Sequence, residues 1–193
     1  LGLPVSGLLG GFVSSTATIT AMGGRARSGQ APLQLARSAA VLSTAATWMQ
    51  VALMASVVVP GALLAWLPMV LVGVVAPLVI GVLLWRRASA TAPGEVPPGR
   101  QVLRLREAAT VGALLIAGAV VVNLAHQRGD LGLMLGTGIA ALADAHAPMV
   151  ALMSMSGTGL IGHDAAMSGV LLAITVNSAT RGVAAWVAGG RVY

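Results

Sequence analysis

The sequence predicts an all-α integral membrane protein with about six transmembrane helices, and three observations support this fold class. Of the 193 residues, 57% are hydrophobic and 8% are charged, whereas soluble domains carry about 25% charged residues. Between Arg37 and Arg86 there is no ionisable side chain. Because one crossing helix needs about 20 apolar residues, this stretch predicts two crossing helices joined by a turn at Pro60-Gly61.

The apolar runs and their breaks predict a single transmembrane domain over residues 1–193. Two hairpins are expected at residues 1–59 and 131–188, and two middle helices at 62–85 and 107–125. Within the hairpins, the crossing helices are expected at 1–22, 32–59, 131–155 and 164–188. The arginine- and proline-bearing segment 86–106 is expected to be an aqueous loop.

All basic side chains are arginines, and the formal net charge is +6. They fall mainly in short segments between apolar runs, where they set membrane orientation, so the lipid bilayer is the expected partner and no nucleic acid is. With six crossings, the loop carrying Arg25 and Arg27 and the loop 86–106 lie on one side, expected to be cytoplasmic. The N-terminus is then expected outside.

The first apolar run contains an unusual concentration of hydroxyl groups. It places five hydroxyl residues within seven positions: Ser14, Ser15, Thr16, Thr18 and Thr20. At membrane depth such groups need a carbonyl, a neighbouring helix or a ligand as partner, because lipid offers none. The stretch is therefore a candidate polar site.

A shift of 130 positions lays the first hairpin on the last. Ser14 then falls on Asp144, Thr16 on His146, and Thr47 on Asn177. We therefore expect a duplicated hairpin whose polar patches meet near the membrane midplane, as in transporters built from repeats. Six crossings make the repeat parallel, and the arginine-free loop after the fifth helix leaves an inverted repeat open.

Asp144 is the only acid well inside an apolar run. An ionised carboxylate at that depth costs at least about 2.5–3.5 kcal/mol, so a neighbour must offset it. His146 lies about 200° away on a regular helix and shares its face only if the helix is interrupted. Gly136, Gly138 and Pro148 favour such an interruption, which would also expose backbone carbonyls.

Two interpretations of these polar residues stay open. In the first, Asp144 and His146 form an ion or solute site, with His146 as proton carrier or nitrogen ligand. Arg181 would favour an anion over a cation. Neutral oxygens would come from five other polar residues: Ser14, Ser15, Thr16, Thr18 and Asn177. In the second, Asp144 and Arg181 form a buried pair that joins two helices, and the hydroxyls bond backbone carbonyls. Whether a metal binds is open, and no cofactor is expected.

Three motifs resemble a known family. G-G-F-V-S-S-T-A-T from Gly10 is followed by Arg25-Ala-Arg27, G-I-A-A-L-A-D-A-H ends at His146, and an asparagine precedes a basic residue between Ala173 and Arg181. Together they resemble the C-terminal domain of MgtC/SapB-like integral membrane proteins, a domain without assigned activity. The resemblance implies a multi-pass protein of the bacterial inner membrane. His146 replaces a usual second acid, and Gln50 replaces a usual basic residue.

We therefore expect a transporter or channel-like protein for a small ion or solute. The alternative is a non-transporting regulatory or interaction protein, related to magnesium or stress, whose polar residues serve helix packing. An enzyme is not expected, because the chain has no cysteine, HExxH, G-x-S-x-G or P-loop. The glycine pairs Gly7/Gly11 and Gly132/Gly136 have the spacing of close helix contacts, so a homo-oligomer is expected.

Overall fold

The computed structural model describes residues 2–89 and 105–193, and all regular secondary structure in these ranges is helical. The elements are α1 (Leu3–Arg27), α2 (Leu33–Val58), η1 (Pro60–Ala62), α3 (Leu63–Ser89), α4 (Leu105–His126), α5 (Gly129–Ala143), α6 (His146–Gly157) and α7 (His163–Gly189). Four segments of this part are long and apolar enough to cross a membrane: Leu3–Arg27, Leu33–Val58, Pro60–Ala88 and His163–Gly189. The predicted all-α membrane protein is confirmed at this level. Most of the predicted loop 86–106 lies outside the described residues.

The chain forms two compact units. The first contains Leu1–Ala52, Leu67–Arg100 and Arg181–Tyr193, and the second contains Leu53–Trp66 and Gln101–Thr180. Each unit contains one helical segment that breaks and turns back.

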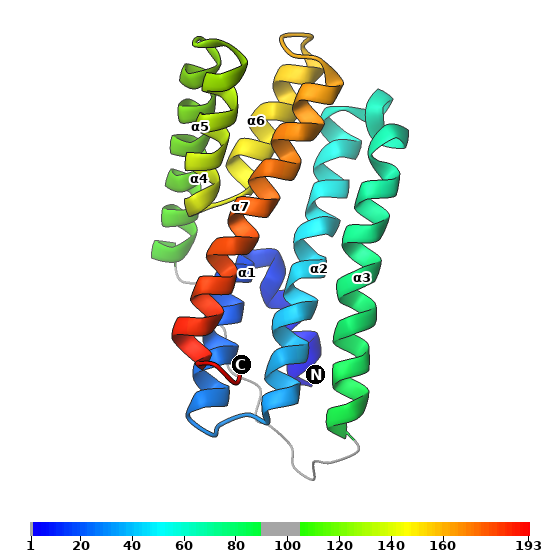
Figure 1. Cartoon of the computed structure of the whole chain (residues 1–193), viewed down its shortest axis with the longest axis vertical. Helices are drawn as coiled ribbons and strands as arrows, with labels where there is room; N and C mark the ends of the chain where they lie inside the picture. The colour runs from blue at the N-terminus through cyan, green and yellow to red at the C-terminus, as the bar shows by residue number, and fades with distance from the viewer. Residues whose placement is uncertain (1, 90–104) are drawn as a thin grey trace. The chain divides into compact units, whose positions relative to one another are not determined.

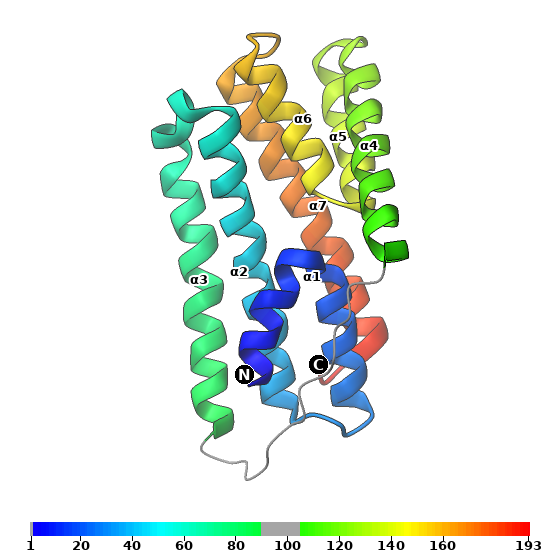
Figure 2. The same ribbon diagram turned by 180° about the vertical axis from the view of Figure 1, so that it is seen from behind.

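In the first unit, α1 folds back on itself at Ser14, whose φ of −163° and ψ of 110° are extended rather than helical. In a straight helix Gly10 and Thr18 would be about 12 Å apart along the axis. Instead, a Cβ placed on Gly10 would lie 2.7 Å from Oγ1 of Thr18. Figure 2 shows the two halves of α1 descending from the bend on the same side. The expected first crossing helix is therefore two short helical arms.

The first arm of α1 packs closely along α2. A Cβ on Gly7 would lie 2.3 Å from the carbonyl oxygen of Ala39, and one on Gly11 would lie 2.6 Å from that of Ser43. Glycine is needed here because backbones touch. This pair thus serves packing inside the chain, and it gives no support to the predicted homo-oligomer.

The start and the end of α1 lie together. Leu3 shares a buried cluster with Met22, Ala31, Ala36 and Ala39. The beginning of α1 is thus at the same end of the unit as the turn that carries Arg25 and Arg27. This geometry does not fit α1 as a full crossing, on which the expectation of an outside N-terminus depends, and that expectation stays a prediction.

Helix α3 runs antiparallel to α2 in this unit. Gly73 faces the ring of Trp48, and Gly81 faces Leu42, while the hydroxyl of Ser38 donates to the carbonyl of Gly81 at 2.7 Å. The end of α3 is therefore beside the beginning of α2. This arrangement places the arginines that end α3 and those that end α1 at one end of the unit, as the sequence predicts.

The second unit contains the other broken helix. The fifth crossing helix was expected over 131–155, with an interruption favoured by its glycines and proline. The structure does interrupt it: α5 ends at Ala143 and α6 begins at His146. At 15 and 12 residues, they are about 22 and 18 Å long, each too short to cross a hydrocarbon core of about 30 Å. Figure 1 shows α6 running back toward the end of the unit where α5 begins.

Helix α4 holds this broken pair together. A Cβ on Gly118 would contact Ala140 in α5 as well as Ala147 in α6, at 3.8 and 2.6 Å. Gly136 packs against Ala125 of α4 in the same way. The second predicted glycine pair is therefore also occupied within the chain.

Candidate functional site

The break between α5 and α6 is built around the carboxylate of Asp144. Its backbone is extended, with φ −158° and ψ 137°, and its amide still donates to the carbonyl of Ala140 at 3.2 Å. Oδ2 then accepts the backbone N–H groups of His146 at 2.9 Å and Ala147 at 3.2 Å. Asp144 thus caps the start of α6, where a negative charge also complements the helix dipole.

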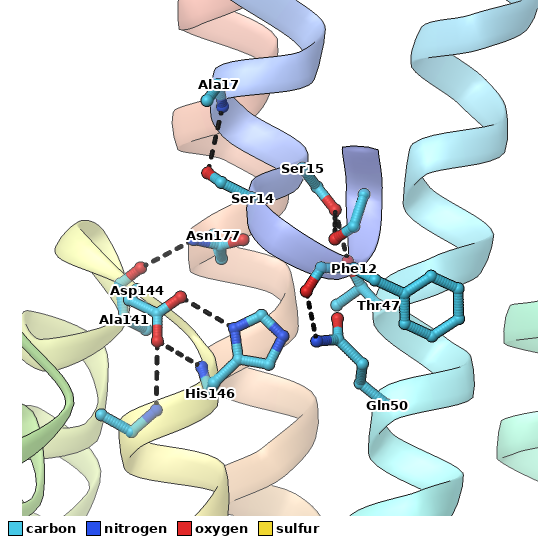
Figure 3. Close-up of polar contacts among 12 residues, drawn as sticks. Phe12, Ser14, Ser15, Ala17, Thr47, Gln50, Ala141, Asp144, His146 and Asn177 are labelled. Atoms are coloured by element: carbon cyan, nitrogen blue, oxygen red, sulfur yellow. Dashed lines mark hydrogen bonds and ion pairs between the residues drawn. The ribbon is translucent and has the colours of Figure 1, made fainter. Parts of the chain in front are cut away.

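The other carboxylate oxygen contacts the imidazole of His146. Asp144 Oδ1 lies 2.8 Å from Nδ1 of that ring, and both side chains are half-buried (Figure 3). An ionised carboxylate only accepts hydrogen bonds, so Nδ1 carries the proton. In the neutral ring Nε2 is then the basic nitrogen, and a second proton there gives an imidazolium paired with the carboxylate.

Asn177 of α7 contacts the same break from another helix. Its Nδ2 donates to the carbonyl of Ala141 at 3.3 Å, and its side chain is buried. Ala141 lies in the last turn of α5, where carbonyls have no partner within the helix. The structure thus brings three predicted site residues, Asp144, His146 and Asn177, to one interrupted segment.

The break in α1 is a neutral counterpart. Oγ of Ser14 accepts the N–H of Ala17 at 3.2 Å and so caps the second arm. On the other side of the bend, Gln50 of α2 donates from Nε2 to the carbonyl of Phe12 at 3.1 Å (Figure 3). In the sequence, Gln50 stands out as a departure from a family pattern. Its polarity among the apolar residues of α2 was the available signal.

Ser15 joins the two helices of the first hairpin. Its hydroxyl lies 2.8 Å from the carbonyl of Ser43, 3.2 Å from that of Gly11, and 2.9 Å from Oγ1 of Thr47. A hydroxyl has one hydrogen, so Ser15 donates to a carbonyl and Thr47 donates to Ser15. This buried set fits the packing interpretation of the hydroxyl cluster.

The remaining predicted residues have separate positions in the first unit. Thr18 is buried against Gly10, and the carbonyl of Thr16 accepts the hydroxyl of Thr20 at 2.9 Å. Arg181 is 7% exposed and lines a cavity of this unit. The pairing of Asp144 with Arg181 joins residues of different units and stays a prediction, as does the meeting of the two polar patches.

Local geometry repeats at an offset of 130 residues. The breaks at Ser14 and Asp144 have the same extended backbone and each caps the helix that follows. The amide-to-carbonyl bonds from Gln30 to Arg25 and from Leu160 to Met155 are both 2.9 Å long. Each turn includes a glycine with positive φ: Gly29 at 72° and Gly159 at 76°. Helices α2 and α7 begin at Leu33 and His163, also 130 apart.

Thr137 of the second unit has a buried polar atom that the sequence does not single out. Oγ1 of Thr137 is fully buried and has no hydrogen-bond partner among the described residues. From the sequence, a threonine hydroxyl without a partner cannot be told from one that donates to a carbonyl of its own helix. In the same described ranges, no group of three or more His, Cys, Asp or Glu side chains is placed to hold a metal ion.

Comparison with known proteins identifies a family but no activity. The family model described as a domain of unknown function, DUF4010, matches residues 1–189. No curated protein and no solved structure matches the chain. Because the family model covers nearly all of the 193 residues, the chain belongs to the DUF4010 family.

Proposed function

We propose that this protein carries a small ion or solute across a membrane, and that the break between α5 and α6 is part of its binding site. The observation that carries the proposal is the ionisable pair Asp144 and His146 at the ends of two half-helices. Ionisable groups at membrane depth are functional candidates by default. Broken helices, with their free half-helix ends, are a common way in which transporters bind ions.

The pair fits a coupled reaction chemically. The carboxylate can accept the positive charge of a cation or of a protonated imidazole, and Nε2 of the imidazole can accept a proton. Passage of a proton or small cation is therefore the leading form of the proposal. The resemblance to the C-terminal domain of MgtC/SapB-like proteins, and with it a bacterial inner-membrane location, belongs to the proposal as well.

The proposed topology has four crossing helices and two re-entrant segments. The crossing helices are α2, α3, α7 and α4, which has 22 residues, is therefore about 33 Å long, and takes the place of the folded-back α1. Helix α1 supplies the first segment and the α5–α6 pair the second. From the arginine-rich side, taken as cytoplasmic, α2 crosses outward, α3 returns and α4 crosses outward. The α5–α6 pair then enters and leaves on the outer side, and α7 returns. The duplicated hairpins are thus inverted, not parallel.

Single-cysteine labelling tests this topology directly, because the native chain has no cysteine. Cysteines replacing Gly2 and Ser28 are expected to react with an impermeant maleimide from one side of oriented vesicles. Cysteines replacing Arg128 and Thr158 are expected to react from the other side. Six crossings would separate the members of each pair, and that result would overturn the re-entrant topology.

Transport is tested by uptake into proteoliposomes across a panel of cations, anions and protons. We expect flux of at least one species above protein-free liposomes. If protons are coupled, His146→Gln should remove the dependence of this flux on a pH gradient while leaving the protein folded. Absence of flux for the whole panel, with protein correctly inserted, would contradict the proposal.

A specific observation favours the rival function. The carboxylate of Asp144 is used by two backbone amides and one imidazole of its own segment, and the hydroxyl of Ser15 is used by packing contacts. If these groups serve only to stabilise the helix breaks, the protein would be a non-transporting regulatory or interaction protein. Stable co-purification with a membrane partner, together with no flux, would support it.

A further inference from the structure

The two units differ in charge. In the described residues of the first unit, every charged side chain is an arginine. The acids in the described ranges all belong to the second unit: Glu107, Asp130, Asp144 and Asp164. The first unit therefore carries a positive field, which favours anions over cations. The proposed role of Asp144 and His146 does not use this feature.

An open cavity lies on the first unit, where the last part of α7 packs against α1 and α2. Its volume is about 230 Å³, many times the roughly 10–15 Å³ that one water needs. The wall contains two arginines and two hydroxyl side chains among small apolar residues: Arg37, Arg181, Thr44 and Tyr193. Two guanidinium groups on one small cavity are the notable feature.

The two arginines are held on α2 and α7 by the fold. Arg37 donates from Nη2 to the carbonyl of Val192, a bond that uses one of five N–H groups on the guanidinium. Arg181 is 7% exposed and is two turns from the end of its helix. Tyr193 is held by a bond from its hydroxyl to the carbonyl of Ile19 at 3.2 Å, and burial raises its pKa, so the phenol stays protonated.

We propose that this cavity binds an oxyanion, a phosphate or a similar group, between Arg37 and Arg181. Planar guanidinium groups match the oxygens of phosphate and carboxylate with paired, charge-assisted hydrogen bonds. The hydroxyl of Thr44 can add a neutral donor.

The same chemistry has two sources, a free anion and the phosphate of a lipid headgroup. Both Arg25 and Arg27 lie at the end of the first unit where α1 turns into α2. Arginines at a membrane surface attract anionic lipids. The experiment therefore has two arms. The detergent-purified protein is titrated with inorganic phosphate, and in parallel it is placed in nanodiscs of phosphatidylcholine with increasing phosphatidylglycerol.

Binding is read as a saturable rise in unfolding temperature and, for phosphate, also by calorimetry. Arg37→Gln is expected to weaken binding at least tenfold, as loss of a charged hydrogen-bond partner predicts. Arg128→Gln is the matched control, because it removes an exposed arginine of the second unit, and it should bind like the native protein. Saturation by phosphate identifies a free anion, and saturation by phosphatidylglycerol alone identifies a lipid headgroup.

A second variant protects the test against misfolding. Ala185→Leu leaves both arginines in place but fills part of the cavity, whose wall includes Ala185, and it should also abolish saturable binding. Asp144→Asn should bind the anion normally, which separates this proposal from the transport proposal. Absence of saturation in both arms would overturn the oxyanion site. Equal weakening by Arg37→Gln and Arg128→Gln would also overturn it, because only net charge would then matter.

Discussion

Asp144→Asn is expected to impair transport while the protein stays folded. Asparagine caps helices as well as aspartate does, so the bonds to the amides of His146 and Ala147 can be kept. The negative charge that pairs with His146 is lost. Loss of a hydrogen-bonding interaction with a charged group costs about 1.5–3 kcal/mol, so binding of the transported species, and with it flux, should fall about tenfold or more.

Comparison with Asp144→Ala separates the effect of the charge from that of the helix cap. Alanine removes both, so this variant should lose flux and also be less stable by about 1 kcal/mol, the usual cost of a lost N-cap. Both variants are compared by uptake into proteoliposomes and by thermal unfolding in detergent. Native flux in Asp144→Asn, with reduced stability in Asp144→Ala, would show that Asp144 only caps α6, as the rival function requires.

Gly7→Ala is expected to disrupt the first unit. The added Cβ would lie 2.3 Å from the carbonyl oxygen and 2.5 Å from the Cα of Ala39. These are backbone atoms of α2 and cannot rotate away, so the arm of α1 must move. Overpacking usually costs about 1–3 kcal/mol and occasionally more. We expect the upper end of this range, and a fall in unfolding temperature of about 10 °C.

Gly24→Ala is the matched control for this substitution. Gly24 is in the same helix, and a Cβ there meets nothing within 4 Å. Alanine is favoured over glycine in helices by up to about 1 kcal/mol, so stability should stay equal or rise. Tryptophan fluorescence during heating measures both variants. Equal stability of Gly7→Ala and the native protein would contradict the close contact between α1 and α2.

The helices with uninterrupted apolar runs could be predicted from the sequence. The second helix was expected at 32–59 and is observed as Leu33–Val58, because no glycine or proline interrupts it and Pro60-Gly61 ends it. An interruption of the fifth helix was also expected, but from Gly136, Gly138 and Pro148. The break lies at Asp144 itself, whereas Gly136 packs on α4 and Pro148 sits in the first turn of α6, where proline is tolerated.

The fold-back of α1 could not be predicted from its composition. Ser14 lies in a continuous apolar run, and its extended backbone depends on partners distant in sequence, such as Gln50 for the carbonyl of Phe12. The alignment of Ser14 with Asp144 was the only local indication. The arginine cavity escaped prediction for the same reason, since Arg37 and Tyr193 are far apart in the chain.

The composition of the first unit constrains the order in which the protein can mature. Its final piece, Arg181–Tyr193, is translated more than a hundred residues after α1 and α2, and it supplies the carbonyls of Val187 and Val192 to Arg27 and Arg37. Until that piece has left the ribosome, Arg27 and Arg37 lack these two hydrogen bonds. Completion of the first unit therefore comes after synthesis of α7.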